Sequence, residues 1–225
     1  MGSLLPNIDP DGLLEYSVVF TDRSLNHMSK TFQKVMTDIS SILKKAYNAE
    51  ATIVIPGGGT YGMEAIARQF ATRKNCLVLR NGWFSYRWTQ ILDQGNIAEY
   101  TTIIKAKRSR DNQQEPFIPP DIKTVSETIS TEKPDVVFAP HVETSSGILL
   151  PDDYLREIAI ATHNAGGIFV LDCVASGALW VDMVDTGVDV LLTAPQKGWS
   201  SSPCSGLVML SSRGKELIGK TKSTS

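Results

Sequence analysis

The chain carries two side chains that could act together on one bound molecule, a lysine and an aspartate. Lys197 comes shortly after an apolar run at residues 189–192, and Asp172 directly follows another at residues 167–171. A lysine amine can condense with an aldehyde, and a carboxylate can keep a pyridine nitrogen protonated. If the two runs are neighbouring strands, this pair is the equipment of pyridoxal phosphate (PLP) chemistry. The alternatives are an ordinary surface lysine and an aspartate that caps a helix or a turn.

A glycine-rich segment is the second candidate site. Residues 57–62 have the spacing GxGxxG, after a β-branched run at residues 51–55 and before a helical pattern. Glycines let backbone N–H groups approach an anion, and a helix N-terminus adds partial positive charge. A dinucleotide site would need an acidic residue about twenty positions further on, where this chain has Arg80. The segment therefore favours phosphate binding over NAD or NADP, with a plain tight turn as the other interpretation.

Other candidates follow further apolar runs, and each has a structural alternative. Phe84 or Trp83 could stack on a bound ring, although aromatic side chains are often buried in a core. Thr144 could bond a cofactor hydroxyl or satisfy the backbone of its own loop. His141 could carry a proton, but local hydrogen bonding is the commoner role. Cys204 is expected to be structural.

The elements that must position these residues alternate along the chain. Apolar runs predict seven strands, at residues 51–55, 76–79, 97–104, 135–139, 167–171, 189–192 and 206–210. Helical spacing predicts helices at residues 24–46, 60–71, 83–92, 121–129 and 152–163. Strands that alternate with helices need crossovers, so we expect an α/β fold of three layers, α/β/α, around a mostly parallel seven-stranded sheet. Ligands bind outside the carboxyl ends of such strands, where the candidate residues stand.

Composition excludes several function classes. The 225 residues are 42% hydrophobic and 20% charged with a net charge of -2, which is typical of a globular domain. This balance gives no support to binding of nucleic acid or of a membrane surface. The three cysteines form neither a disulfide framework nor a metal-ligand pattern, and no apolar run approaches the roughly 18 residues of a membrane span. We expect no metal site and a cytoplasmic location.

Taken together, the candidate segments resemble the class V aminotransferases, within the fold-type I PLP-dependent enzymes. The nearest branch is that of the alanine–glyoxylate and serine–glyoxylate (serine–pyruvate) aminotransferases. The resemblance runs from about residue 7 to residue 210. It rests on the order and spacing of residues 26–29 (NHMS), 57–65 (GGGTYGMEA), 81–88 (NGWFSYRW), 141–147 (HVETSSG), 171–176 (LDCVAS) and 194–197 (APQK).

The resemblance implies a role for each candidate residue. Lys197 would bond covalently to the cofactor, and Asp172 would bind its pyridine nitrogen. The other cofactor-binding residues would be Gly58, Gly59, Thr60 and Gln196 at the phosphate, Phe84 and Val174 on the two ring faces, and Thr144 near the ring hydroxyl. The implied activity is a ping-pong transfer of an amino group from alanine or serine to an oxo acid such as glyoxylate or pyruvate. The implied assembly is a homodimer.

The chain also departs from the family pattern. A hydroxyl often stands where this chain has Gly58, and residues 6–10 lack the usual GPGP stretch. We expect an N-terminal extension (residues 1–23), the PLP-binding large domain (24–213) and a disordered tail (214–225). The small C-terminal domain, which binds the substrate carboxylate in the family, has no counterpart, so we expect a fragment of a longer protein. The alternatives are a PLP-dependent lyase or desulfurase and a truncated module that binds cofactor without turnover.

Overall fold

The computed structural model describes residues 30–221 of the chain. The chain divides into two compact units, Met1–Ile42 and Leu43–Ser225. In the first unit, the described residues begin helix α1 (Lys30–Tyr47), as the spacing of apolar residues predicts. The predicted start of this helix at residue 24 lies outside the described residues.

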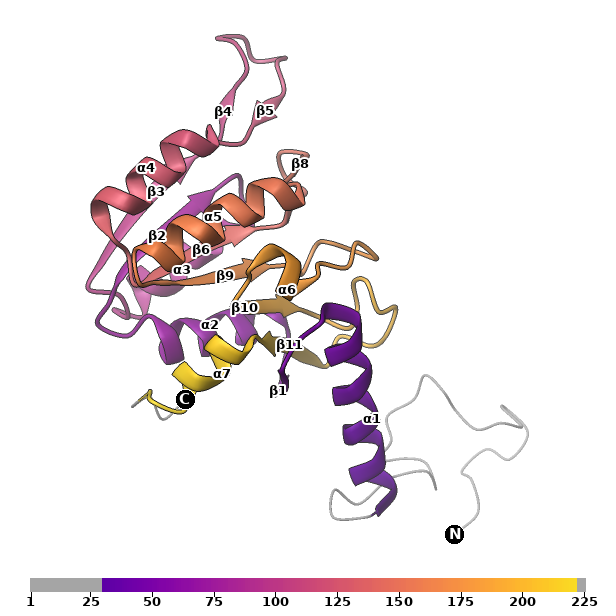
Figure 1. Cartoon of the computed structure of the whole chain (residues 1–225). Coiled ribbons are helices and arrows are strands. Elements are labelled where there is room, and N and C mark those ends of the chain that lie inside the picture. The colour runs from indigo at the N-terminus through magenta and orange to yellow at the C-terminus, as the bar shows by residue number, and fades with distance from the viewer. Residues whose placement is uncertain (1–29, 222–225) are drawn as a thin grey trace. The chain divides into compact units, whose positions relative to one another are not determined.

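The second unit is built on a seven-stranded sheet (Figure 1). Its strands are β1 (Ala51–Pro56), β2 (Asn75–Arg80), β3 (Tyr100–Lys105), β6 (Val136–Pro140), β9 (Ile168–Asp172), β10 (Val190–Thr193) and β11 (Ser205–Leu210). They lie in the order β1-β11-β10-β9-β6-β2-β3. Only β11 runs antiparallel to its neighbours in this sheet, so the other six strands all end at the same edge. The predicted mostly parallel, seven-stranded sheet is confirmed.

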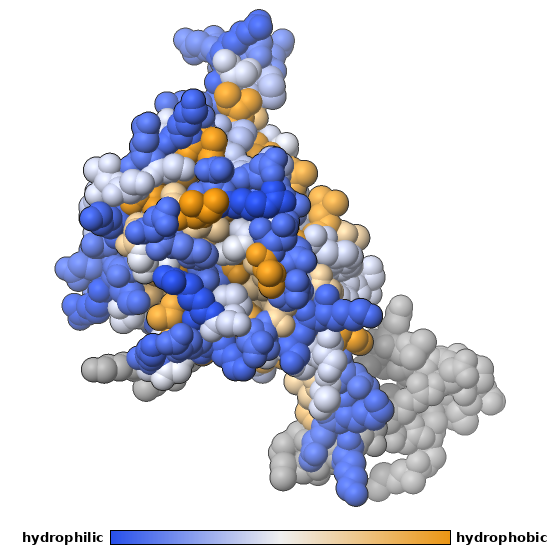
Figure 2. Space-filling model, in the orientation of Figure 1, coloured by the Kyte–Doolittle hydropathy of each residue, from blue (hydrophilic) through white to orange (hydrophobic). Residues whose placement is uncertain are grey.

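Helices cover both faces of the sheet. They are α2 (Gly59–Phe70), α3 (Tyr86–Gln94), α4 (Ile122–Glu132), α5 (Asp152–Asn164), the short α6 (Met183–Thr186) and α7 (Ser212–Ile218). Figure 1 shows α4 and α5 side by side across one face, with α2 and α3 behind the sheet. The expected α/β/α arrangement is therefore confirmed. Figure 2 shows that the face covered by α4 and α5 is mostly hydrophilic, with apolar residues in small scattered groups.

The core follows from the alternation of strand side chains. Cys76 and Val78 of β2 are buried on the face covered by α2 and α3, in one cluster with Phe70 and Trp88. The rings of Trp88 and Phe138 in this cluster lie 4.5 Å apart between centroids. Every residue of β6 is buried, as expected for a central parallel strand covered on both faces.

Two segments differ from the sequence-based expectation. Residues 105–120, for which no helix or strand was predicted, contain a short hairpin of β4 (Lys107–Arg108) and β5 (Phe117–Ile118), in which the Arg108 guanidinium lies 4.5 Å from the Phe117 ring centroid. Two-residue strands leave no periodic pattern in a sequence. Residues 214–225 were predicted to be a disordered tail, but residues 214–218 belong to helix α7 (Ser212–Ile218). The prediction is therefore wrong for these five residues. Ser211 caps this helix by accepting a hydrogen bond from the N–H of Gly214.

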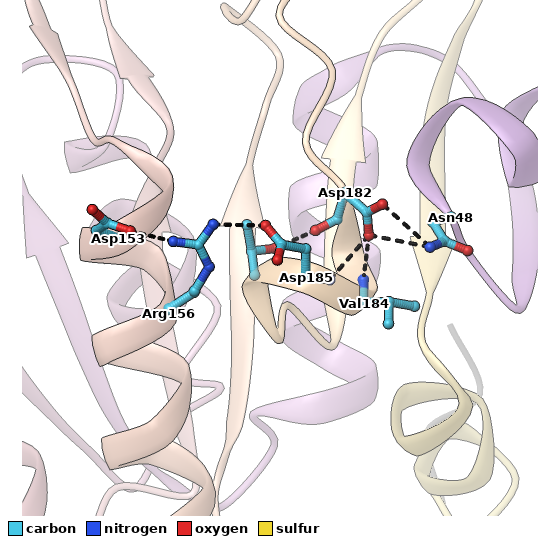
Figure 3. A network of polar contacts seen from close by, with 7 residues as sticks. Asn48, Asp153, Arg156, Asp182, Val184 and Asp185 are labelled. Carbon is cyan, nitrogen blue, oxygen red and sulfur yellow. Dashed lines mark hydrogen bonds and ion pairs between the residues drawn. The ribbon is translucent and has the colours of Figure 1, made fainter.

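A polar network fixes the segment that follows the carboxyl end of β9 (Figure 3). Asp182 caps α6 by accepting hydrogen bonds from the N–H groups of Val184 (2.9 Å) and Asp185 (3.0 Å). Its carboxylate also accepts from the side-chain amide of Asn48 at 3.2 Å. Arg156 of α5 forms an ion pair with Asp185 at 2.7 Å. The loop between β9 and α6 is thereby held at its far end by two neighbouring elements.

Among the described residues, no helix has the length and apolar character needed to cross a membrane.

Candidate active site

A cavity of about 640 Å³ opens at the sheet edge where β1, β2, β6, β9 and β10 end. All of the predicted site residues except Gly58 line it, namely Gly59, Thr60, Phe84, Thr144, Asp172, Val174, Gln196 and Lys197. Gly58 lies immediately outside the lining, at the N-cap of α2. Residues from five separate loops therefore meet at one place, as the strand ends predict.

Asp172 is the last residue of β9 and is only 8% exposed. One of its oxygens accepts a hydrogen bond from the N–H of Val174 at 3.0 Å. Burial raises the pKa of Asp172 to about 6, against a smaller lowering by that N–H group. Among the ion pairs of the described residues, none includes this carboxyl. Because no ion pair of the described residues neutralises it, the buried Asp172 carboxylate would be stabilised by a ligand that brings a positive charge to it.

Lys197 stands in the turn after β10 and lines the same cavity. Its turn packs directly against the loop that follows Asp172, because a Cβ at Gly198 would come 1.9 Å from the carbonyl oxygen of Gly177. Next in the turn, the Trp199 ring packs against the Trp180 ring in a tilted arrangement, with ring centroids 4.7 Å apart. The lysine loop and the aspartate loop thus hold each other in place.

The end of the cavity where the sequence predicts phosphate binding is formed by the N-terminus of α2. Gly58 has extended backbone (φ -165°), and neither a side-chain cap nor an acidic residue occupies the first turn of the helix. The N–H groups at this terminus are thus free to bind an anion, and the helix dipole favours one. A Cβ at Gly59 would lie 3.1 Å from the Val174 side chain, so this position has little room for one. Beside the helix, Arg87 lies 3.5 Å from the Thr60 hydroxyl and adds a positive charge.

The cavity walls suit a flat ring. Phe84 lines the cavity and is 54% exposed, whereas Trp83 does not line it. Of the two aromatic candidates that the sequence left open, Phe84 is therefore the one that can contact a ligand in the cavity. Val174 and Thr144 provide further wall. The side-chain oxygen of Gln196 is buried without a hydrogen-bond partner, an unfavourable state that a bound polar group would relieve.

Two side chains near the cavity, those of His141 and Cys173, are buried in the protein and have structural surroundings. His141 is buried and its Nδ1 lies 2.7 Å from the Ser176 hydroxyl, outside the cavity lining. Burial also lowers its pKa and so favours the neutral ring. Cys173 is buried, and burial raises the pKa of its thiol. Neither side chain reaches the cavity.

Sequence reasoning missed several lining residues: Met63, Arg87, Pro140, Val142, Ala175 and Gly177. Arg87 is the one with a charge, and it comes three residues after Phe84. Phe84 lies in the turn before α3 and Arg87 in the first turn of that helix, so no helical spacing in the sequence links the two side chains. The remaining five are small or apolar and complete the walls.

The donor set fits PLP on these observations. A carboxylate without a cation stands on β9, an amine follows β10, and a helix N-terminus flanked by a guanidinium begins after β1. An exposed aromatic ring supplies an apolar wall between them. Among the described residues, no cluster of three or more His, Cys, Asp or Glu side chains could hold a metal ion.

Comparison with known proteins gives a consistent result. A family model described as "Aminotransferase class-V" matches residues 13–221. The chain is 27% identical to an alanine–glyoxylate aminotransferase of Rattus norvegicus over 204 residues, which are 89% of this chain and 46% of that protein. It is 27% identical to 2-aminoethylphosphonate–pyruvate transaminase 2 of Paraburkholderia xenovorans (strain LB400), over 76% of this chain and 44% of that protein.

Solved structures show the same architecture. Ureidoglycine–glyoxylate aminotransferase from Bacillus subtilis superposes with a TM-score of 0.77 at 20% identity, over 89% of this chain and 50% of that one. Aspartate aminotransferase from Thermus thermophilus superposes with a TM-score of 0.71 at 26% identity, over 86% and 52%. The chain therefore spans about half the length of the relatives that it matches.

Proposed function

Because this chain belongs to the class V aminotransferase family, whose cofactor is PLP, we propose that it transfers amino groups from a small amino acid to an oxo acid. The observation that carries the proposal is the convergence of Lys197 and Asp172 on one cavity, beside the N-terminus of α2. When bound, PLP supplies an aldehyde for the amino group and a ring that accepts electrons from the substrate Cα. The residues of this chain provide the attachment, the charges and the proton transfer.

Each site residue has a separate task. Asp172 would hold a proton on the ring nitrogen, and its buried position would strengthen that charge interaction. Lys197 would attach the cofactor covalently, and as a free amine it would act as the general base for the proton on the substrate Cα. Phe84 and Val174 would contact the ring faces, and Thr144 would lie near the ring hydroxyl.

The phosphate is bound by backbone and side-chain donors together. The N–H groups of Gly59 and Thr60 stand at the start of α2, and Gln196, whose side-chain NH2 group is a donor, lines the same cavity. Arg87 adds a full charge within reach of Thr60. A phosphate at a helix N-terminus is favoured both by the unpaired N–H groups and by the helix dipole.

The proposed substrates are alanine or serine as amino donor and glyoxylate or pyruvate as acceptor, in a ping-pong cycle. Support comes from relatives whose names pair alanine with glyoxylate and 2-aminoethylphosphonate with pyruvate. We assign residues 24–213 to the PLP-binding large domain and residues 1–23 to an N-terminal extension. The functional assembly proposed is a homodimer in the cytoplasm.

The test is an amino-transfer assay with alanine or serine and glyoxylate or pyruvate, after addition of PLP. The protein should form pyruvate or hydroxypyruvate from the donor, and Lys197→Ala should abolish turnover because both the attachment and the base are lost. Near-normal transfer by Lys197→Ala would refute the assignment. Release of sulfide from cysteine would indicate a desulfurase instead. Cofactor binding without consumption of any amino acid would indicate a binding module without turnover.

A further inference from the structure

Glu143 is a fully buried carboxylate beside the cavity, although it does not line it. It belongs to β7 (Val142–Glu143), which pairs with β8 (Ile148–Leu149) in a short hairpin. We propose that Glu143 is a positioning residue that sets the place of the Phe84 ring against the cofactor. This inference rests on the proposed function and concerns a residue that has no contact with the cavity itself.

The two oxygens of Glu143 hold the turn that carries Phe84. Oε1 accepts hydrogen bonds from the N–H of Phe84 (3.1 Å) and from the hydroxyl of Ser145 (2.5 Å). Oε2 accepts from the N–H of Ser85 (2.8 Å) and from its hydroxyl (2.7 Å). Ser145 in turn accepts from the N–H of Trp83 at 2.7 Å. Three consecutive backbone N–H groups are therefore bound by Glu143 and Ser145.

The same carboxylate lies just before the start of helix α3. The helix starts at Tyr86, its N-cap Ser85 makes no side-chain capping bond, and no acidic residue stands in its first turn. Glu143, from a distant part of the chain, binds the N–H groups of Phe84 and Ser85 that precede the helix and brings a negative charge near this N-terminus. Burial alone raises the pKa of Glu143, but hydrogen bonds from Ser145, Ser85 and Phe84 outweigh it and lower the pKa, so the carboxylate stays charged.

The turn at residues 82–85 has little room to move relative to Glu143 and Ser145. A Cβ at Gly82 would come 2.2 Å from the Ser145 hydroxyl and 2.7 Å from the Glu143 side chain, so the backbone is pressed against both. Phe84, by contrast, is 54% exposed. Its ring is thus placed through its backbone more than through packing around the side chain. The residue after Glu143 is Thr144, which lines the cavity, so one short hairpin sets two of the cavity walls.

The test is a double-mutant cycle on PLP affinity. Glu143→Gln keeps the size of the side chain but turns one acceptor into an amide donor that faces N–H groups. We expect it to weaken PLP binding about tenfold, the effect of one lost hydrogen bond to a charged group. In a Phe84→Ala background, where no ring remains to be misplaced, Glu143→Gln should have no further effect. The dissociation constants are measured by quenching of tryptophan fluorescence.

A second readout separates positioning from folding. The circular dichroism induced in bound PLP reports the orientation of its ring, and Glu143→Gln should change it. Glu157→Gln is the matched control, since Glu157 is exposed on α5 and should behave as the wild type. If Glu143→Gln does not fold, as judged by thermal unfolding, Ser145→Ala loosens the same turn more gently and should show the same dependence on Phe84.

Two results would overturn the inference. They are unchanged PLP affinity in Glu143→Gln, and an equal loss of affinity with and without Phe84. Failure of the proposed function looks different, because then the wild type would either not bind PLP saturably or bind it without transferring an amino group.

Discussion

In the cofactor-free protein, burial of Asp172 outweighs the stabilisation of its charged form by the Val174 N–H group, and this makes its titration measurable. Without cofactor, burial raises its pKa from 3.8 to about 6 in the folded protein. Between these two values the folded state keeps a proton that the unfolded state has released. The contribution of Asp172 to stability is therefore fully present below about pH 4 and is lost as the pH rises through about 6.

The variant Asp172→Asn should abolish this dependence. In cofactor-free protein, the free energy of unfolding of the wild type should fall relative to Asp172→Asn by roughly 3 kcal/mol between about pH 4 and pH 7. Urea unfolding of both proteins across this range measures the difference. Parallel pH profiles for the two proteins would show that the Asp172 carboxyl is not desolvated in the folded state.

Arg87 gives a second prediction for a single residue. If it binds the cofactor phosphate beside Thr60, Arg87→Gln should weaken binding of PLP about tenfold, as expected for loss of a charge-assisted hydrogen bond. Binding of pyridoxal, which has no phosphate, should be unchanged. Equal loss of affinity for both ligands, in the same fluorescence titration, would place Arg87 elsewhere in the site.

At the scale of an element, the N-terminus of α2 has room for a side chain at its N-cap residue, Gly58. Gly58 has φ -165°, which any residue adopts, and a Cβ there would meet nothing within 4 Å. A serine at this N-cap would add a hydroxyl for the phosphate and a cap for the helix.

Gly58→Ser should therefore bind PLP more tightly, by about fivefold, and should also unfold at a higher temperature. Gly58→Ala is the matched control: it tests the added Cβ without the hydroxyl and should not improve affinity. If the alanine and serine variants bind PLP equally well, the hydroxyl makes no contact with the phosphate.

Elements with local signals were predictable from sequence, and those fixed by distant contacts were not. The β-branched and apolar runs indicated all seven strands of the main sheet, within a few residues. Helix α3 was expected from residue 83 but begins at Tyr86, because Glu143 holds residues 83–85 in a turn. The apolar pattern of a sequence carries no trace of such a partner.

The residues of the candidate site also divide into those with a local signal in the sequence and those fixed by distant contacts. Lys197 and Asp172 could be placed because Asp172 directly follows one strand-like pattern and Lys197 comes a few residues after another, and parallel strands bring their carboxyl ends to one edge. Arg87 could not, because its position depends on which face α3 turns to the sheet. Glu143 was part of a recognisable segment, but its role lies in bonds to the backbone of a loop about sixty residues away in the chain.

At the scale of the whole molecule, the edge that carries the cavity also exposes large aromatic side chains. Tyr61 is 66% exposed, Trp83 is 68% exposed and Phe84 is 54% exposed. Exposed aromatic groups gathered near a site are usually covered by a partner or a ligand. We expect a second copy of the chain here, in accord with the proposed homodimer. Sedimentation velocity at micromolar concentration should show a dimer, and a monomer at all concentrations would contradict this assembly.

The most direct test asks which residue the cofactor reaches. PLP is added in equimolar amount, the covalent link is fixed by reduction with borohydride, and the modified peptide is identified by mass spectrometry. The pyridoxyl group should be found on the peptide that contains Lys197, and it should be absent when the same treatment is applied to Lys197→Ala. Modification spread over surface lysines to the same extent in both proteins would contradict the assignment of Lys197.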